Sequence, residues 1–188
     1  MIEKFVLKDG KSVIIKRLLR EDYEKNNNYE FVHDWLHQVN EYLLSEFEKE
    51  TLEQDKERYY KGLSDEKAQI VVGAINNDKI IGSSSLQINL YRPKVKHVGT
   101  WGIAIHPDFH NQGLGTKLLA SIEEIAYKRG LRKLEAEFFE GNEIAQKLYI
   151  EKLNYEIEGR RKFSCLLKDG SYVDRILIGK VIDKSVKQ

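Results

Sequence analysis

Residues 106–116 carry the clearest chemical signal in this sequence, a glycine-containing turn at the start of an expected helix. The turn reads His-Pro-Asp-Phe-His-Asn-Gln-Gly-Leu-Gly-Thr, with Gly113 and Gly115 at the junction between a strand and a helix. Residues without a Cβ let the main chain approach a bulky group, and the first N–H groups of a helix have no internal partner. Such N–H groups bind phosphate oxygens, and the helix dipole adds to the attraction. We therefore interpret the turn as a pyrophosphate site.

The turn differs from two other phosphate-binding patterns. It has neither the Gly-Lys-Ser/Thr ending of a nucleotide-triphosphate loop nor the third glycine of a dinucleotide fingerprint. A Gly-x-Gly helix start that binds no ligand stays an alternative on this pattern alone.

Cys165, the single cysteine, is expected inside a strand as a buried and inert thiol. One cysteine forbids a disulfide within the chain, and Lys4, Lys8 and Lys11 interrupt any apolar run of a signal peptide. These features favour a reducing cytoplasm. No set of His, Cys, Asp and Glu has metal-ligand spacing, so we expect neither a structural nor a catalytic metal.

Length and charge limit the classes of function. The 188 residues suit a single domain, with a frayed tail after about residue 183. Lys plus Arg number 31 against 30 for Asp plus Glu, a formal charge of +1, which argues against nucleic-acid binding despite the basic residues 159–162. No stretch approaches the roughly 18 apolar residues of a membrane span. We expect neither nucleic acid nor membrane as a partner, and a homodimer is one assembly that the sequence allows.

Hydrophobic periodicity predicts alternating strands and helices around the turn. Turn residues at 8–11, 76–78 and 168–171 separate β-rich runs and indicate hairpins. Residues 21–62 are helical in pattern and hold two or three helices, whose aromatic side chains we interpret as packing rather than as a ligand cage. The predicted strands are 5–7, 13–18, 68–75, 79–90, 96–105, 131–139, 158–167 and 172–182, and further helices are predicted over 114–130 and 142–152.

The order of these elements and three short motifs resemble the GNAT superfamily of acyl-CoA-dependent N-acyltransferases over residues 13–182. The resemblance implies an α/β (α+β) fold with a central mixed, mostly antiparallel twisted sheet of about seven strands and flanking helices. The C-terminal part of the sequence resembles the bacterial branch of this superfamily that includes ribosomal-protein and spermidine N-acetyltransferases. The motifs are the strand end Ile105-His106-Pro107, the Gly-x-Gly helix start, the series Asn142, Ala145, Leu148, Tyr149, and, for the branch, Glu158-Gly159 with Tyr172-Val173-Asp174.

Two positions depart from the family pattern. His110 stands where the phosphate turn usually has Arg or Gln, and Asn154-Tyr155 replaces Gly-Phe. Neither departure weakens the expected fold or cofactor much, because the turn works through main-chain donors.

The resemblance implies a site for acetyl-CoA. The backbone of residues 103–105 would pair with the pantetheine arm, residues 112–116 would hold the diphosphate, and Asn142 and Tyr149 would lie near the thioester. Tyr149 would protonate the leaving thiolate as a general acid, with a packed helix aromatic as the alternative. The expected cofactor-binding residues are Ile103, Ala104, Ile105, His110, Asn111, Gln112, Gly113, Leu114, Gly115, Thr116, Asn142 and Tyr149.

The mechanism implied is direct attack of an amine on the acyl carbonyl, for which the general base is unclear from the residues. Thr100 occupies the position where the family often has Glu. Glu137 is our substitute candidate and shares a strand face with Glu135, although an exposed charged face is the alternative. His97 and His106 titrate in a useful range, but histidines at strand ends are more often surface or capping residues.

The sequence thus predicts an N-acetyltransferase that uses acetyl-CoA and a primary amine, either a small amine, an amino acid or a peptide N-terminus. The alternative is a non-catalytic acyl-CoA-binding sensor, which the missing Glu at Thr100 keeps open. The acceptor site would be walled by the helical region, with a solvated helix face as the alternative for its carboxylates. These carboxylates are Glu41, Glu46, Glu48, Glu50 and Glu53.

Overall fold

The computed structural model describes residues 2–45, 47–48, 51–183 and 185. Within these residues, eight strands form one sheet in the order β1-β2-β3-β4-β5-β6-β8-β7, in which only the β5–β6 pair is parallel. The strands are β1 (Ile2–Val6), β2 (Ser12–Arg17), β3 (Gln69–Asn76), β4 (Lys79–Ile88), β5 (Val98–Ile105), β6 (Lys133–Phe139), β7 (Glu156–Leu166) and β8 (Tyr172–Val181). The helices are α1 (Arg20–Glu24), α2 (Asn28–Gln38), α3 (Leu52–Ser64), α4 (Leu114–Lys128) and α5 (Glu143–Gln146).

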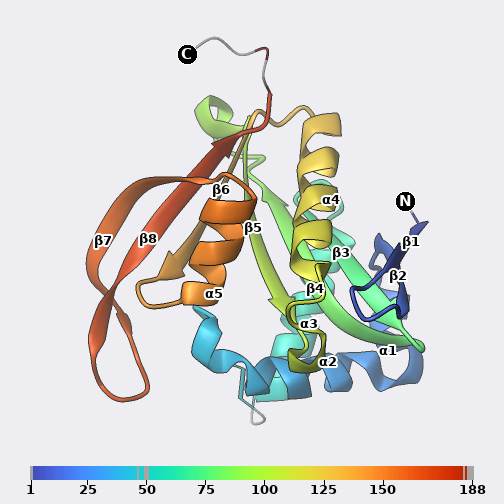
Figure 1. Ribbon diagram of the computed structural model, residues 1–188. Helices are drawn as coiled ribbons and strands as arrows, with labels where there is room; N and C mark the ends of the chain where they lie inside the picture. The colour runs from blue at the N-terminus through green and yellow to red at the C-terminus, as the bar shows by residue number, and fades with distance from the viewer. Residues whose placement is uncertain (1, 46, 49–50, 184, 186–188) are drawn as a thin grey trace.

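Helices cover both faces of the sheet (Figure 1). On one face, α4 buries Leu118, Leu119 and Ile122 against residues of the central strands and against the α5 region. Burying one such side chain contributes about 1.5–3 kcal/mol. On the other face, α1, α2 and α3 pack Tyr23 and Trp35 against the first half of the sheet in a second cluster. None of the described helices is long and apolar enough to cross a bilayer.

The strands β5 and β6 part along their length, and this feature positions the site. Their pairing runs only from Val98 to Thr100 on β5 and from Lys133 to Glu135 on β6. Beyond these pairs β5 continues to Ile105 alongside β4, while β6 continues to Phe139 alongside β8. Figure 1 shows the two strands diverging, with the α5 region lying against them.

The predicted mixed, mostly antiparallel architecture is confirmed, and the described sheet has the eight strands that periodicity predicted, where the resemblance implied about seven. The turns form as local chemistry dictates: Gly10 and Gly170 take φ of 86° and 84° in the two Lys-Asp-Gly hairpins. The predicted helix over residues 142–152 is α5 followed by a π-helical turn over Lys147–Lys152. The predicted fraying after residue 183 and the predicted roles of Glu46 and Glu50 fall almost entirely outside the described residues.

Two expectations about burial had different outcomes. Most aromatic side chains of the α1–α3 region pack as predicted, and Tyr29 and Tyr60 are buried in the second cluster with Tyr23 and Trp35. The expectation that Cys165 is buried is wrong, because its side chain is only half-buried. The register of β7 against β8 shifts between Arg161 and Cys165, so this end of the hairpin departs from regular pairing.

Candidate active site

A cavity of about 200 Å³ lies where β5 ends, between α4 and the α5 region. Its lining comes from both sides of the sheet. The segment after α2 contributes on the α1–α3 side, and α4 and α5 contribute on the other. The lining residues that the sequence predicted are Ile103, Ala104, Ile105, His110, Asn111, Gly113, Leu114, Gly115, Thr116, Asn142 and Tyr149.

The start of α4 presents unbonded N–H groups to this cavity. Gly113 is the N-cap with φ of 83°, and Asn111 before it also has a left-handed φ of 60°. The first main-chain bond into the helix runs from Lys117 N to Gly113 O over 3.1 Å. The N–H groups of Leu114, Gly115 and Thr116 precede it and have no acceptor within the part of the chain that the structure describes, so they can bind an anion with the positive end of the helix dipole behind them.

Gly115 serves the packing of the site. A Cβ at this position would lie 2.9 Å from Leu148 Cδ2 and 3.3 Å from Ile105 Cδ1. The absent side chain thus allows α4 to approach the α5 region and the end of β5. The sequence interpretation assigned this glycine to the approach of a ligand, whereas the close neighbours in the structure are protein side chains.

His110 ties the turn to the strand that it follows. Its Nε2 lies 2.9 Å from Ile105 O, and since a carbonyl oxygen only accepts, Nε2 carries the hydrogen. The departure from the family pattern at this position is therefore a residue that holds the loop against β5.

Gln112 is the one predicted cofactor-binding residue that does not line the cavity. Its Oε1 accepts from Asp9 N over 3.1 Å and its O accepts from Lys8 N over 3.4 Å. These bonds hold the β1–β2 hairpin beside the turn.

Asn142 uses both ends of its side-chain amide within the protein. Its Oδ1 accepts from Ala145 N over 3.0 Å and caps α5. Its Nδ2 donates to Tyr42 O over 2.9 Å, across 100 residues of sequence. Asn142 therefore fixes the segment after α2 beside the α5 region and shapes the cavity from both sides.

Tyr149 both packs and faces the cavity. Its ring lies edge-on to Trp101, with centroids 4.8 Å apart, and 5.9 Å from the ring of Phe138. Burial raises the pKa of Tyr149 well above its ordinary value, so the hydroxyl keeps its proton through the neutral range. The two predicted alternatives, packed aromatic and proton donor, are thus compatible.

The residues proposed as bases lie apart from the cavity lining. Arg175 Nη1 donates to Glu137 Oε1 over 2.7 Å, and Arg161 Nη1 lies 3.5 Å from Glu137 Oε2. Glu135 is paired with Lys133 at 2.8 Å. Thr100, exposed, sits at the last β5–β6 pair.

His106 acts as the cap that the sequence favoured over a base. Its Nδ1 accepts from Asp108 N over 3.2 Å, and its ring stacks on Phe31 with centroids 5.7 Å apart. Burial lowers the pKa of His106, and the nearby Asp108 carboxylate opposes this only in part. His106 is therefore a neutral capping residue at the end of β5 near neutral pH. His97 is exposed.

The sequence predicted that the helical region would wall the site, but it did not single out the residues after α2 that line the cavity, or the two lysines. Val39, Tyr42 and Leu43 follow a helix with no motif of their own, and only tertiary folding brings them to the site. Lys147 and Lys152 had a usable signal, because both lie on the predicted helix that carries Tyr149. The remaining missed lining residues are Phe109, Ile144, Ala145 and Leu148.

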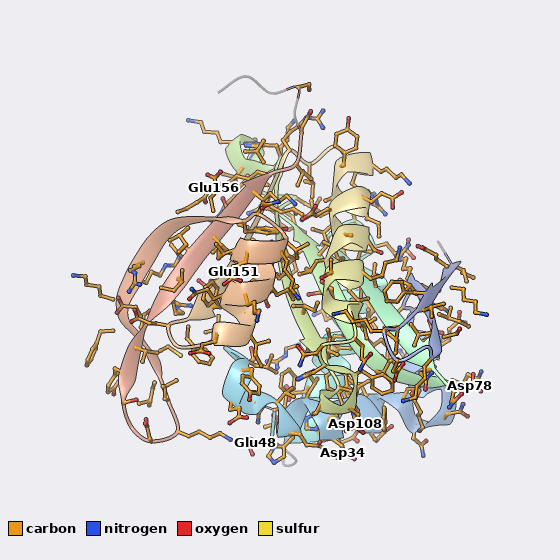
Figure 2. The ribbon with its side chains drawn as sticks, viewed as in Figure 1. Asp34, Glu48, Asp78, Asp108, Glu151 and Glu156 are labelled. Atoms are coloured by element: carbon orange, nitrogen blue, oxygen red, sulfur yellow. The ribbon has the colours of Figure 1, made fainter. Side chains whose placement is uncertain are left out.

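The carboxylates of the helical region, which were candidates for the wall of the acceptor site, do not line the cavity. Glu41, Glu48 and Glu53 are absent from its lining. Figure 2 shows Glu48 and Asp34 at the α2 end of the molecule, while Glu151 lies on the α5 region. Across the described ranges, no three His, Cys, Asp or Glu side chains gather in a way that could hold a metal ion.

Comparisons with known proteins agree with this geometry. The model of the Acetyltransferase (GNAT) family matches residues 29–155. The L-amino acid N-acetyltransferase AaaT of Escherichia coli is 30% identical over 113 residues, which are 59% of this chain and 67% of the relative. An acetyltransferase of the GNAT family from Streptococcus pneumoniae is 26% identical, with a TM-score of 0.73 over 90% of this chain and 99% of that chain. The Salmonella typhimurium protein yncA, solved with its cofactor acetyl-CoA, is 15% identical, with a TM-score of 0.75 over 93% of this chain and 96% of that chain.

Proposed function

This chain belongs to the acetyltransferase (GNAT) family and is an acyl-CoA-dependent N-acetyltransferase, and from this premise we propose that it moves an acetyl group from acetyl-CoA to a primary amine. The acceptor is a small amine, an amino acid or a peptide N-terminus. The observation that carries the proposal is that one cavity contains both the free N–H groups at the start of α4 and the protonated Tyr149. The name of the Escherichia coli relative supports an amino-group acceptor.

The residues of the cavity suit acetyl-CoA. The N–H groups of Leu114, Gly115 and Thr116 would hold the diphosphate, and Lys147 and Lys152 would add positive charge beside it. Residues 103–105 no longer pair with β6, so their main-chain groups on that side are available to the amides of the pantetheine arm. Acetyl-CoA supplies the activated acyl group. The salmonella neighbour's bound cofactor supports this choice of co-substrate.

The chain itself contributes orientation and a proton. Holding an amine and a thioester together in the reactive geometry contributes about 7–11 kcal/mol in well-oriented cases. Tyr149 donates its phenolic proton to the thiolate that leaves, which its raised pKa permits at neutral pH. The attack is direct, so the half-buried Cys165 has no covalent role.

Deprotonating the acceptor depends on its type. At pH 7, removing the ammonium proton costs a free energy of about 1.4 kcal/mol for a peptide α-amino group with a pKa near 8. For a lysine-like nitrogen with a pKa near 10.4, the free-energy cost is about 4.6 kcal/mol. Glu137 is the candidate base and would act through water. Its two contacts with guanidinium groups leave this role a prediction.

The protein is further proposed to act as one domain in the cytoplasm. Both apolar clusters pack against the same continuous sheet, which supports one domain, and the lone cysteine suits a reducing compartment.

The test is turnover. The protein is incubated with acetyl-CoA and a panel of amino acids, peptides and polyamines, while free thiol is monitored and products are identified by mass spectrometry. Thiol release that needs both protein and amine is expected. Acetyl-CoA binding in calorimetry without thiol release for any amine would instead identify a non-catalytic acyl-CoA sensor.

A further inference from the structure

The sheet has a second, open face beside the cavity. Phe138, Ile176 and Ile178 pack into the cluster beneath α4, so the side chains that alternate with them point to the opposite face. The α1–α3 cluster contains residues of β3 and β4 and Ala104 of β5, but none from β6, β7 or β8. Among the residues that the structure describes, the α1–α3 cluster does not cover this face of β6, β8 and β7; we call it the open face, and it carries Glu137 and Arg175.

Arg175 is held firmly on the open face. Its Nη1 donates to Glu137 Oε1 over 2.7 Å, and its Nε donates to Ser164 Oγ over 3.3 Å. The Ser164 hydroxyl in turn donates to Arg161 O over 2.7 Å. The Arg175 side chain is 27% exposed, and its Nη2 has no hydrogen-bond partner among the residues that the structure describes.

A strained turn of β7 creates this arrangement. Phe163 has φ of 56°, a conformation that aromatic residues rarely adopt, in the register shift between Arg161 and Cys165. The Phe163 N–H donates to Asp174 Oδ1 over 3.0 Å, which holds the irregular backbone in place. The shift brings Ser164 to the Arg175 guanidinium. Strain of this kind persists where the surrounding structure enforces it, and functional sites are where it gathers.

Arg175 lies one strand away from the wall of the cavity. It pairs across the sheet with Phe139, the last residue of β6. The Phe139 carbonyl accepts from Asn142 N over 3.1 Å, and Asn142 lines the cavity. Arg175 therefore lies on the β8 side of the β6 end that leads into the cavity wall.

The charges on the open face are separated along β6. Around Glu135, at the point where the strands part, one lysine faces two carboxylates: Lys133 lies 2.8 Å from both Glu135 and Glu158. Around Glu137, two guanidinium groups face one carboxylate. The two groups are two residues apart on the strand, or about 7 Å. The excess of positive charge around Glu137 suits an anionic group such as a carboxylate, and the excess of negative charge at the gap suits a cationic one.

We propose that Arg175, assisted by Arg161, binds the carboxylate of the acceptor, and that the acceptor class is the free amino acids. This rests on the proposed function and deepens it. Arg175 keeps Glu137 Oε1 on Nη1 and uses Nη2 for the acceptor, so this oxygen and Ser164 position the guanidinium, in addition to the base role proposed above for Glu137. Charge-assisted hydrogen bonds of this type are the strong ones, and Arg suits planar carboxylates.

The first experiment compares L-amino acids with their amides, which keep the amine and the side chain but lose the negative charge. Acetylation by the intact protein is expected to show a kcat/KM about 10- to 100-fold higher for the acids. Equal or better use of the amides would overturn the proposal while leaving the proposed acetyltransferase activity intact.

The second experiment uses variants. Arg175→Gln is expected to raise KM for amino acids about 10- to 100-fold, with a smaller effect on kcat and none on the amides, and Arg175→Lys should recover part of the loss. Arg160→Gln is the matched control, because Arg160 lies on the neighbouring strand β7 and pairs with Glu140 and Asp174 instead of Glu137. A loss in Arg175→Gln that is equal for acids and amides would reduce Arg175 to a structural role.

A binding measurement keeps the proposal separate from turnover. Calorimetry of amino acids and amides against the protein saturated with CoA should show tighter binding of the acids, and Arg175→Gln should remove the difference. If no amine is acetylated but this difference is present, the proposed catalysis fails and the carboxylate site stands. If amines are acetylated but acids and amides bind equally well, the proposed catalysis stands and the carboxylate site is wrong.

Discussion

The side-chain amide of Asn142 donates to the main-chain oxygen of Tyr42 over 2.9 Å, and so joins the start of α5 to the segment that follows α2. These parts lie 100 residues apart in sequence. Because residues on both sides of this bond line the cavity, one amide sets the separation of its two walls.

Replacing Asn142 should therefore affect both stability and cofactor use. Asn142→Ala removes the cap of α5 and the bond to Tyr42, and is expected to lower the free energy of unfolding by about 1–3 kcal/mol and to raise KM for acetyl-CoA. Asn142→Asp keeps an acceptor for Ala145 N but has no hydrogen for Tyr42 O. Urea unfolding should show a loss of stability for the Asp variant as well, because its buried carboxylate faces the Tyr42 oxygen, and KM should stay raised. A normal KM in the Asp variant would show that the Tyr42 bond has no part in cofactor binding.

The left-handed backbone at Gly113 gives a second prediction. Its φ of 83° is unfavourable for any residue with a branched Cβ, and a Cβ would also lie 3.8 Å from Phe5 Cζ. Gly113→Val is expected to weaken acetyl-CoA binding by about 100-fold, equal to about 2.8 kcal/mol, as measured by calorimetry. Gly170→Val is the control, since Gly170 has φ of 84° in a hairpin that does not line the cavity. Retained tight binding in Gly113→Val would remove the turn from the cofactor site.

Tyr149 provides a prediction for the chemical step. Tyr149→Phe keeps the ring against Trp101 and removes the proton, so kcat should fall by about 100-fold, at the lower end of general-acid contributions, with little change in stability. Since burial raises the pKa of Tyr149, its acid form persists between about pH 7 and pH 10, and kcat should show no decline from Tyr149 in that window. Tyr155→Phe is the control, because its buried ring also packs on Trp101 but does not line the cavity. An alkaline decline in kcat that disappears in Tyr149→Phe would contradict this assignment.

His106 predicts how stability responds to acid. Burial holds the pKa of His106 below its ordinary value of 6.5, so the unfolded chain takes up the proton more readily than the folded protein. The stability that its neutral form contributes is complete above about pH 6.5 and is lost as the pH falls through the lower folded value. Urea midpoints for His106→Phe should therefore fall less between about pH 7 and about pH 5 than those of the unaltered protein. A steeper acid loss in His106→Phe would contradict the assignment.

The sequence predicted the features that depend on local chemistry. Helix α4 ends at Lys128, close to the predicted end at Gly130, and Gly130 takes φ of 84° and donates its N–H to Tyr127 O. Asn154 replaces a family glycine and still takes φ of 56°, because Asn tolerates the left-handed region. The predicted turn at residues 106–116 forms at the cavity for the same reason, since its glycines, proline and helix start act within a few residues.

The unpredicted features depend on contacts distant in sequence. No local pattern shows that Tyr42 meets Asn142, or that Gln112 turns away to the β1–β2 hairpin. Cys165 is only half-buried and lies at the shifted register of β7, which the alternation of apolar and polar residues in the sequence does not reveal. Whether Glu137 is free or paired likewise depends on Arg175 from a neighbouring strand.

The parting of β5 from β6 has a consequence for inhibitor design. The lining of the cavity reaches both sides of the sheet at this point, through Tyr42 on one side and Leu148 on the other. A single conjugate in which CoA is joined through its sulfur to an amino acid would thread this opening and engage both halves at once. Such a bisubstrate compound should bind more tightly than either half alone, because binding of one half raises the effective concentration of the other at its site. The linker length that gives the highest affinity would then measure the distance between the donor and acceptor sites.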